Sequence, residues 1–82
     1  MKTIMIDGNQ YETAKDFHRG LQRMLNLPEY YGCNADALND CLSESMEPLQ
    51  AWILSRGTGE VEKAVTLCAQ VIEDNNGTVK EL

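Results

Sequence analysis

The segment LPEYYGCNADALNDCL, residues Leu27–Leu42, determines how the first half of the chain is organised. Pro28 lacks an amide donor and restricts the residue before it, so a helix arriving from the N-terminal side has to end before it. Asn34 is a favoured N-cap and predicts a second helix that ends near Ser43 or Met46. Two successive helices joined by a short loop are therefore expected here.

On the N-terminal side, residues 2–7 (KTIMID) form a short isoleucine-rich run that predicts a strand, and the turn-prone DGNQ closes it. Thr13 is a candidate cap for the first helix. The apolar residues that follow recur at helical spacing and predict one buried face: Phe17, Leu21, Met24 and Leu25. His18, next to Phe17, is expected at the surface.

On the C-terminal side, residues 49–55 (LQAWILS) form a continuous apolar run that predicts a buried strand. RGTG, residues 56–59, predicts a turn into a third helix, and Gly77 is expected to end that helix in the left-handed conformation. TVKEL, residues 78–82, predicts a final strand. The order strand, helix, helix, strand, helix, strand predicts an α/β fold in which helices pack on the faces of a three-stranded parallel sheet.

Composition restricts the possible functions. The 82 residues predict a single domain, and the formal net charge of −6 argues against nucleic acid or an anionic membrane as the direct partner. A membrane span needs about 20 consecutive apolar residues, and no apolar run approaches this length. The N-terminal residues do not resemble a signal peptide. An odd count of three cysteines is typical of a reducing compartment, so we expect a cytoplasmic protein.

The chemically reactive side chains form no recognisable site. Cys33, Cys41, Cys68 and His18 lack metal-ligand spacing and any nucleophile–base signature. We therefore expect no metal, no cofactor and no enzymatic activity. A small thiol enzyme is the rival hypothesis, and it requires an unusually reactive Cys33 or Cys41.

An acidic face is the stronger candidate. Residues 24–55 contain no lysine, arginine or histidine, and helical spacing places Asp36 and Asp40 on one face. Glu44 extends the series, and like charges at this spacing repel one another. The face is either a solvated helix surface or a binding surface for a cationic partner. Tyr30 and Tyr31 favour binding, because tyrosines are enriched at interfaces, and we expect one to pack inward while the other is presented.

The motif LPEYYG, followed by Asn34 and then DAL and DCL, resembles the barstar family of intracellular ribonuclease inhibitors. The resemblance is densest over Phe17–Leu42 and weaker elsewhere. It implies a barstar-like fold, and a monomer whose second helix and preceding loop enter the cleft of a basic, barnase-like ribonuclease in a 1:1 complex.

The resemblance also implies roles for individual residues. Asp40 would take the phosphate site, Asp36 would meet a nearby basic residue and Tyr30 would pack on the catalytic histidine of the enzyme. The predicted partner-binding residues are Tyr30, Tyr31, Gly32, Asn34, Asp36, Asn39, Asp40, Glu44 and Glu73.

The chain also departs from the family pattern. Asn39 stands where the family carries tryptophan, Cys33 stands where it carries an acid, and a short helix after the second strand is missing. These departures leave an alternative open, in which the same fold binds a different cationic protein without inhibiting a ribonuclease.

Overall fold

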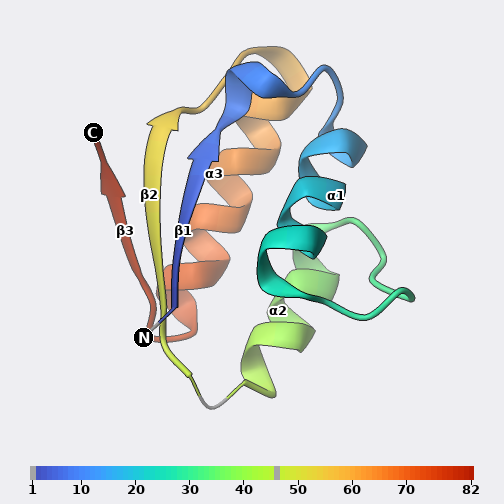
Figure 1. The fold of residues 1–82 in the computed structure, drawn as a ribbon, viewed down its shortest axis with the longest axis vertical. Helices are drawn as coiled ribbons and strands as arrows, with labels where there is room; N and C mark the ends of the chain where they lie inside the picture. Colours follow the sequence, from blue (N-terminus) through green and yellow to red (C-terminus); the bar gives the residue numbers. More distant parts are fainter. Residues whose placement is uncertain (1, 46) are drawn as a thin grey trace.

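The computed structural model describes residues 2–45 and 47–82 and confirms the expected fold class. The elements follow the order β-α-α-β-α-β, with a 3-10 turn at Gly8–Gln10 (Figure 1): β1 Lys2–Asp7, α1 Ala14–Leu25, α2 Ala35–Ser43, β2 Leu49–Ser55, α3 Gly59–Asp74 and β3 Thr78–Glu81. The second helix ends at Ser43, the earlier of the two predicted positions, and Met46 lies outside the described residues.

The three strands form a parallel sheet in which β2 lies between β1 and β3. Burial alternates along β2, so Ala51 and Ile53 are buried while Leu54 is 49% exposed. Met5, on the same face as Leu54, is 51% exposed. The described helices therefore cover one face of the sheet (Figure 1), so the expectations of helices on its faces and of a buried β2 hold for that face alone. An apolar run looks the same in sequence whether one face or both are covered.

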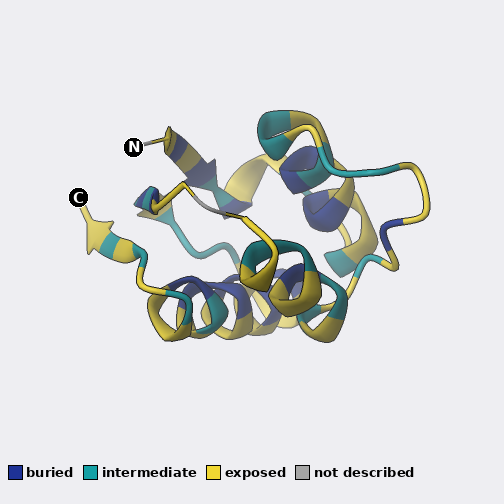
Figure 2. Ribbon diagram, turned by 90° about the horizontal axis from the view of Figure 1, so that it is seen from below, coloured by how far each residue is buried: buried dark blue, intermediate teal, exposed yellow. Residues whose placement is uncertain are grey.

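The core lies between the covered face of the sheet and the helices, where α1 and α3 turn their buried residues inward (Figure 2). Phe17 and Leu21 anchor α1, and six residues of α3 are buried. Leu38 is the only fully buried residue that α2 contributes to the described core. Three further residues of α2, Ala37, Cys41 and Leu42, are partly buried and pack against this core, while its polar residues remain in solvent.

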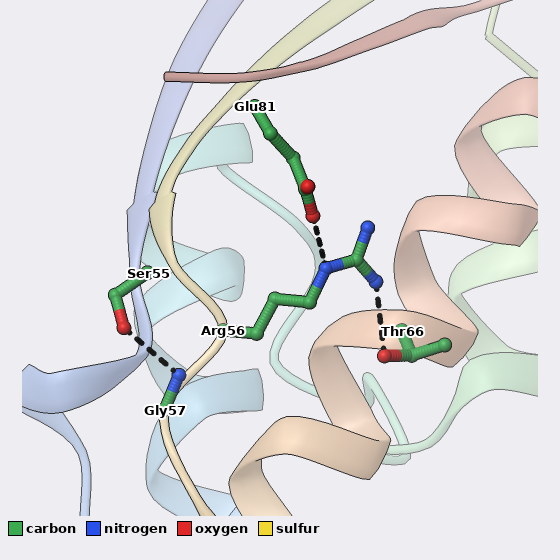
Figure 3. Close-up of polar contacts among 5 residues, drawn as sticks. All are labelled: Ser55, Arg56, Gly57, Thr66 and Glu81. Carbon is green, nitrogen blue, oxygen red and sulfur yellow. Dashed lines mark hydrogen bonds and ion pairs between the residues drawn. The ribbon is translucent and has the colours of Figure 1, made fainter.

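Arg56 is the first cationic residue after residues 24–55, and its side chain binds other residues of the chain at the C-terminal ends of the strands (Figure 3). Arg56 follows β2, forms an ion pair with Glu81 of β3, and donates a 2.9 Å hydrogen bond from Nη1 to Thr66 Oγ1 of α3. The next residue, Gly57, donates its amide to Ser55 Oγ. Arg56 therefore joins the sheet to α3, far along the strands from α2.

The C-terminus of α3 differs from the prediction in one residue. The left-handed residue is Asn76, with φ 66°, and Gly77 is not among the glycines with positive φ. Gly77 is needed for a different reason: its amide donates to Ile72 O at 2.9 Å, and a Cβ there would lie 2.6 Å from Leu49 O. Asparagine tolerates the left-handed conformation well enough to take the role expected of glycine.

Gly77→Ala should therefore destabilise the fold by about 1–3 kcal/mol, the usual cost of forcing an extra carbon into a packed site. Urea unfolding measures this change. Asn76→Gly, one residue earlier, should leave stability equal or slightly higher, because glycine adopts positive φ freely. Equal stabilities for Gly77→Ala and the unmodified chain would contradict the close approach.

Candidate functional site

The loop between α1 and α2 is fastened to the end of α1 by hydrogen bonds. Asn26 adopts φ 54° and turns the chain, so that Leu27 N donates to Gln22 O at 2.9 Å. The side chain of Gln22 then donates from Nε2 to Pro28 O at 2.7 Å, and Tyr31 N donates to the same carbonyl at 3.0 Å. The backbone from Leu27 to Tyr31 is therefore held in one conformation by neighbouring groups.

A buried polar pair supports this loop from below. His18 Nδ1 lies 2.7 Å from Tyr31 Oη, and both side chains are 4% exposed. The Tyr31 hydroxyl also lies within 3.5 Å of Asn34 O, at the start of α2. The prediction of a surface His18 was wrong. Its spacing of three and seven residues from Leu21 and Leu25 places it on the buried face of α1, and this spacing was the available signal.

Burial keeps both members of the pair neutral. It lowers the pKa of His18 below its ordinary value of 6.5, because a desolvated imidazolium is disfavoured. Burial is also the main cause of the raised pKa of Tyr31, with smaller contributions from nearby cysteines. The pair therefore acts as a neutral hydrogen bond inside the protein and is not placed to exchange protons with a bound molecule.

The two tyrosines separate as expected: Tyr31 packs inward, and Tyr30 is presented with 85% of its surface exposed. Tyr31 is one of the predicted binding residues, and its buried side chain supports the loop from inside. Gly32 is exposed, and Cys33 adopts φ 55° as the chain turns towards α2. Tyr30 is thus a large side chain on a loop whose backbone is already ordered.

Asn34 joins the loop to α2 with both ends of its side-chain amide. Its Oδ1 accepts from Ala37 N at 2.7 Å, which caps the helix as predicted, and its Nδ2 donates to Gly32 O at 3.2 Å. The position and direction of α2 therefore depend on the same loop that presents Tyr30.

The polar residues of α2 lie in solvent: Asp36, Asn39, Asp40 and Glu44 are all exposed. Asp36 occupies the first turn, where a carboxylate interacts favourably with the helix dipole. Asp40 and Glu44 lie towards the C-terminal end, where a carboxylate is unfavourable, and the last turn contains no basic residue. The charges of Asp40 and Glu44 therefore do not serve the stability of the helix.

The end of α3 lies beside this surface. Asn75 Nδ2 donates to Asn39 Oδ1 of α2 at 2.8 Å, which brings the two helices into direct contact. Glu73 is exposed in the last turn of α3, which also lacks a basic residue. The predicted residues of α2 and Glu73 are therefore carried by adjoining elements, and no ion pair is recorded for these acids in the described part of the chain.

Cys41 and Cys68 are poorly suited to nucleophilic chemistry. Burial raises the pKa of Cys68 to about 12, and the pKa of Cys41 is raised by burial and then by Glu44 and Asp40. A thiol that resists ionisation is a weak nucleophile. Within residues 2–45 and 47–82, no group of three or more potential ligands could hold a metal ion, and no helix has the length and hydropathy of a membrane span.

The fold and this surface define a class of protein: a small α/β protein with a three-stranded parallel sheet that presents an acidic helix behind a fastened tyrosine loop. The chain belongs to the barstar family, because the family model described as Barstar (barnase inhibitor) matches residues 1–75. It is also similar to the putative ribonuclease inhibitor YrdF of Bacillus subtilis (strain 168), with 46% identity over 43 residues. This match covers 52% of the chain and 47% of YrdF, so it spans about half the length of that relative.

The buried pair predicts a pH-dependent stability. Because the pKa of His18 is lowered in the folded state, the free energy of unfolding should be highest above about pH 6.5 and should fall as the pH drops towards 5. The slope that His18 contributes cannot exceed about 1.4 kcal/mol per pH unit. Urea unfolding between pH 5 and pH 8 measures it.

His18→Gln removes the titrating group and should flatten this part of the profile. Tyr31→Phe keeps a buried imidazole and should retain the slope at a lower overall stability. Identical slopes for His18→Gln and the unmodified chain would show that the imidazole is not the group responsible.

Proposed function

We propose that this chain is a protein inhibitor of a basic, barnase-like ribonuclease, and that the Tyr30 loop and α2 occupy the active-site cleft of that enzyme. Family membership and the name of the Bacillus relative support ribonuclease inhibition in general. The observation that carries the finer proposal is the exposed Tyr30 on a hydrogen-bonded loop that leads directly into a helix with unpaired acids.

The proposed mechanism is occupation of a phosphate-binding cleft by carboxylates. A ribonuclease cleft carries cationic side chains because it binds RNA phosphates, and an acidic helix supplies the same negative charge without a cleavable bond. Asp40 takes the phosphate position and accepts charge-assisted hydrogen bonds, and Asp36 meets a basic residue nearby. Glu44 and Glu73 flank this contact. The chain acts as an inhibitor and performs no catalysis of its own.

Order in the free protein favours tight binding. The loop that presents Tyr30 is fixed by Gln22, Tyr31 and Asn34, so little conformational freedom is lost when a partner covers it. The net charge of −6 attracts a basic enzyme from a distance and accelerates the encounter. A monomer that forms a 1:1 complex is sufficient for this mechanism.

Titration of purified protein into a barnase-like ribonuclease should abolish RNA cleavage at a 1:1 ratio. Asp40→Asn should weaken binding by about 2–5 kcal/mol, a range established in part on the ribonuclease–inhibitor pair that gives the family its name. Glu62→Gln, which removes one charge from the exposed first turn of α3, is the matched control and should change binding little. Equal affinities for the two variants would refute the role of Asp40.

Tyr30→Ala should weaken the complex by about 2 kcal/mol or more and should act mainly by faster dissociation, because it removes an aromatic anchor. Leu67→Ala removes a large exposed side chain from α3 and serves as the control. Surface plasmon resonance with immobilised enzyme gives both rates. Unchanged dissociation from Tyr30→Ala would place the contact elsewhere on the protein.

A second candidate function is binding of a different cationic protein by the same surface. Asn39 favours it, since a small exposed amide stands where the family carries a large aromatic side chain. Capture of basic proteins on the immobilised chain, followed by a nuclease assay of each captured protein, separates the two functions. A tight partner without nuclease activity would support this candidate.

A further inference from the structure

The side chains of Asn39 and Asn75 form a hydrogen-bonded contact between α2 and the end of α3. Asn75, the C-cap of α3, donates two hydrogen bonds from its Nδ2, each 2.8 Å long. One goes to the backbone carbonyl of Val71, in the preceding turn of α3. The other goes to Oδ1 of Asn39, on the exposed side of α2.

The backbone carbonyl determines which way both amides point. The oxygen and nitrogen of a carboxamide are assigned from their hydrogen bonds, and Val71 O can only accept. The Asn75 atom beside it therefore has to be the NH₂ group. This group has two hydrogens, and the second one points to Asn39, so Asn39 has to offer its oxygen there.

The orientation of Asn75 thus fixes the orientation of Asn39. With its oxygen held by Asn75, Asn39 turns its NH₂ group away from α3, and no described residue accepts a hydrogen bond from it. The flanking carboxylates of Asp36, Asp40 and Glu44 can only accept when ionised. Asn39 is therefore a hydrogen-bond donor set among acceptors on the exposed surface of α2.

We propose that Asn39 is a specificity-determining residue that requires a neutral hydrogen-bond acceptor on the partner, such as a carbonyl or hydroxyl oxygen among its cations. Asn75 is the positioning residue that keeps the Asn39 donor outward. This inference rests on the proposed function, because it assumes that the partner covers α2. A partner carboxylate is disfavoured at this point by repulsion from the acids of α2, and a partner ammonium or guanidinium group cannot accept.

The outward donor of Asn39 changes which partners the surface selects. Carboxylates alone would accept any cleft of sufficient positive charge, whereas a covered donor without an acceptor makes a complex weaker by roughly tenfold to a hundredfold. Asn39 thus discriminates between basic proteins by whether they place a hydrogen-bond acceptor opposite its NH₂ group, and not by their charge.

Asn39→Asp provides a test in which charge and hydrogen bonding predict opposite results. The variant keeps an oxygen towards Asn75, loses the donor and gains a negative charge. If charge alone governs binding, its complex with the barnase-like ribonuclease should be as tight as that of the unmodified chain or tighter. If the donor is required, the complex should be roughly tenfold to a hundredfold weaker, with faster dissociation.

Asp40→Asn, measured in the same titration, separates the two proposals. If Asp40→Asn leaves binding unchanged, the proposed function is wrong, whatever Asn39→Asp does. If Asp40→Asn weakens binding while Asn39→Asp leaves it equal or tighter, the donor role of Asn39 is wrong and the acidic surface stands.

Asn75→Asp tests the positioning role without altering α2. A carboxylate at this position has no hydrogen to donate, so Asn39 should turn its NH₂ group towards α3 and present its oxygen to the partner. Binding should weaken as it does for Asn39→Asp. Asn76→Asp adds the same charge one residue later, at an exposed position with no recorded contact to Asn39, and should change binding little. Equal binding by Asn75→Asp and Asn76→Asp would overturn the positioning role.

The free protein gives a readout that needs no partner. In ¹⁵N nuclear magnetic resonance spectra, the side-chain NH₂ hydrogens of Asn75 should exchange slowly with solvent, and those of Asn39 should exchange rapidly. Slow exchange at Asn39 with rapid exchange at Asn75 would reverse the assigned orientation and overturn the inference. Thermal unfolding of each variant establishes that it is folded before binding is measured.

Discussion

The hydrogen bond between His18 and Tyr31 is the constraint on which the candidate site depends. It joins α1 to the loop at a point where both partners are removed from water, so its loss would leave two polar groups buried without a partner. The same tyrosine holds the start of α2 through Asn34 O, and its neighbour Tyr30 is turned outward. The order of the loop and the direction of α2 therefore both depend on the buried side chain of Tyr31.

The acidic residues of α2 make this helix less stable than it could be. Its carboxylates repel one another, those near its C-terminal end oppose the helix dipole, and Leu38 is its only fully buried anchor in the described core. Two hydrogen bonds offset part of this loss of stability: the Asn34 cap at the N-terminus of α2, and the contact of Asn39 with Asn75 of α3. Residues that break local preferences in this manner are typically retained for function, and here they lie together on the surface that the proposal assigns to the partner.

The features that the sequence predicts correctly are mostly those whose physical signal is local. Pro28 and Asn34 predicted the end of one helix and the start of the next because proline and capping side chains act on adjacent backbone groups. The pairing of His18 with Tyr31 and that of Asn39 with Asn75 join residues 13 and 36 positions apart, and no local pattern specifies such pairings. The family resemblance predicted the fold and the candidate surface, but Asn75 carries no motif that would have drawn attention to it.

The uncovered face of the sheet has a spectroscopic consequence. Trp52 is the only tryptophan of the chain, and it projects from β2 on the same face as Met5 and Leu54, opposite the helices. Its fluorescence should follow the unfolding of the sheet, because its surroundings belong to the sheet and not to α2. The protein thus carries an intrinsic reporter of its own folding that is separate from the surface proposed for binding.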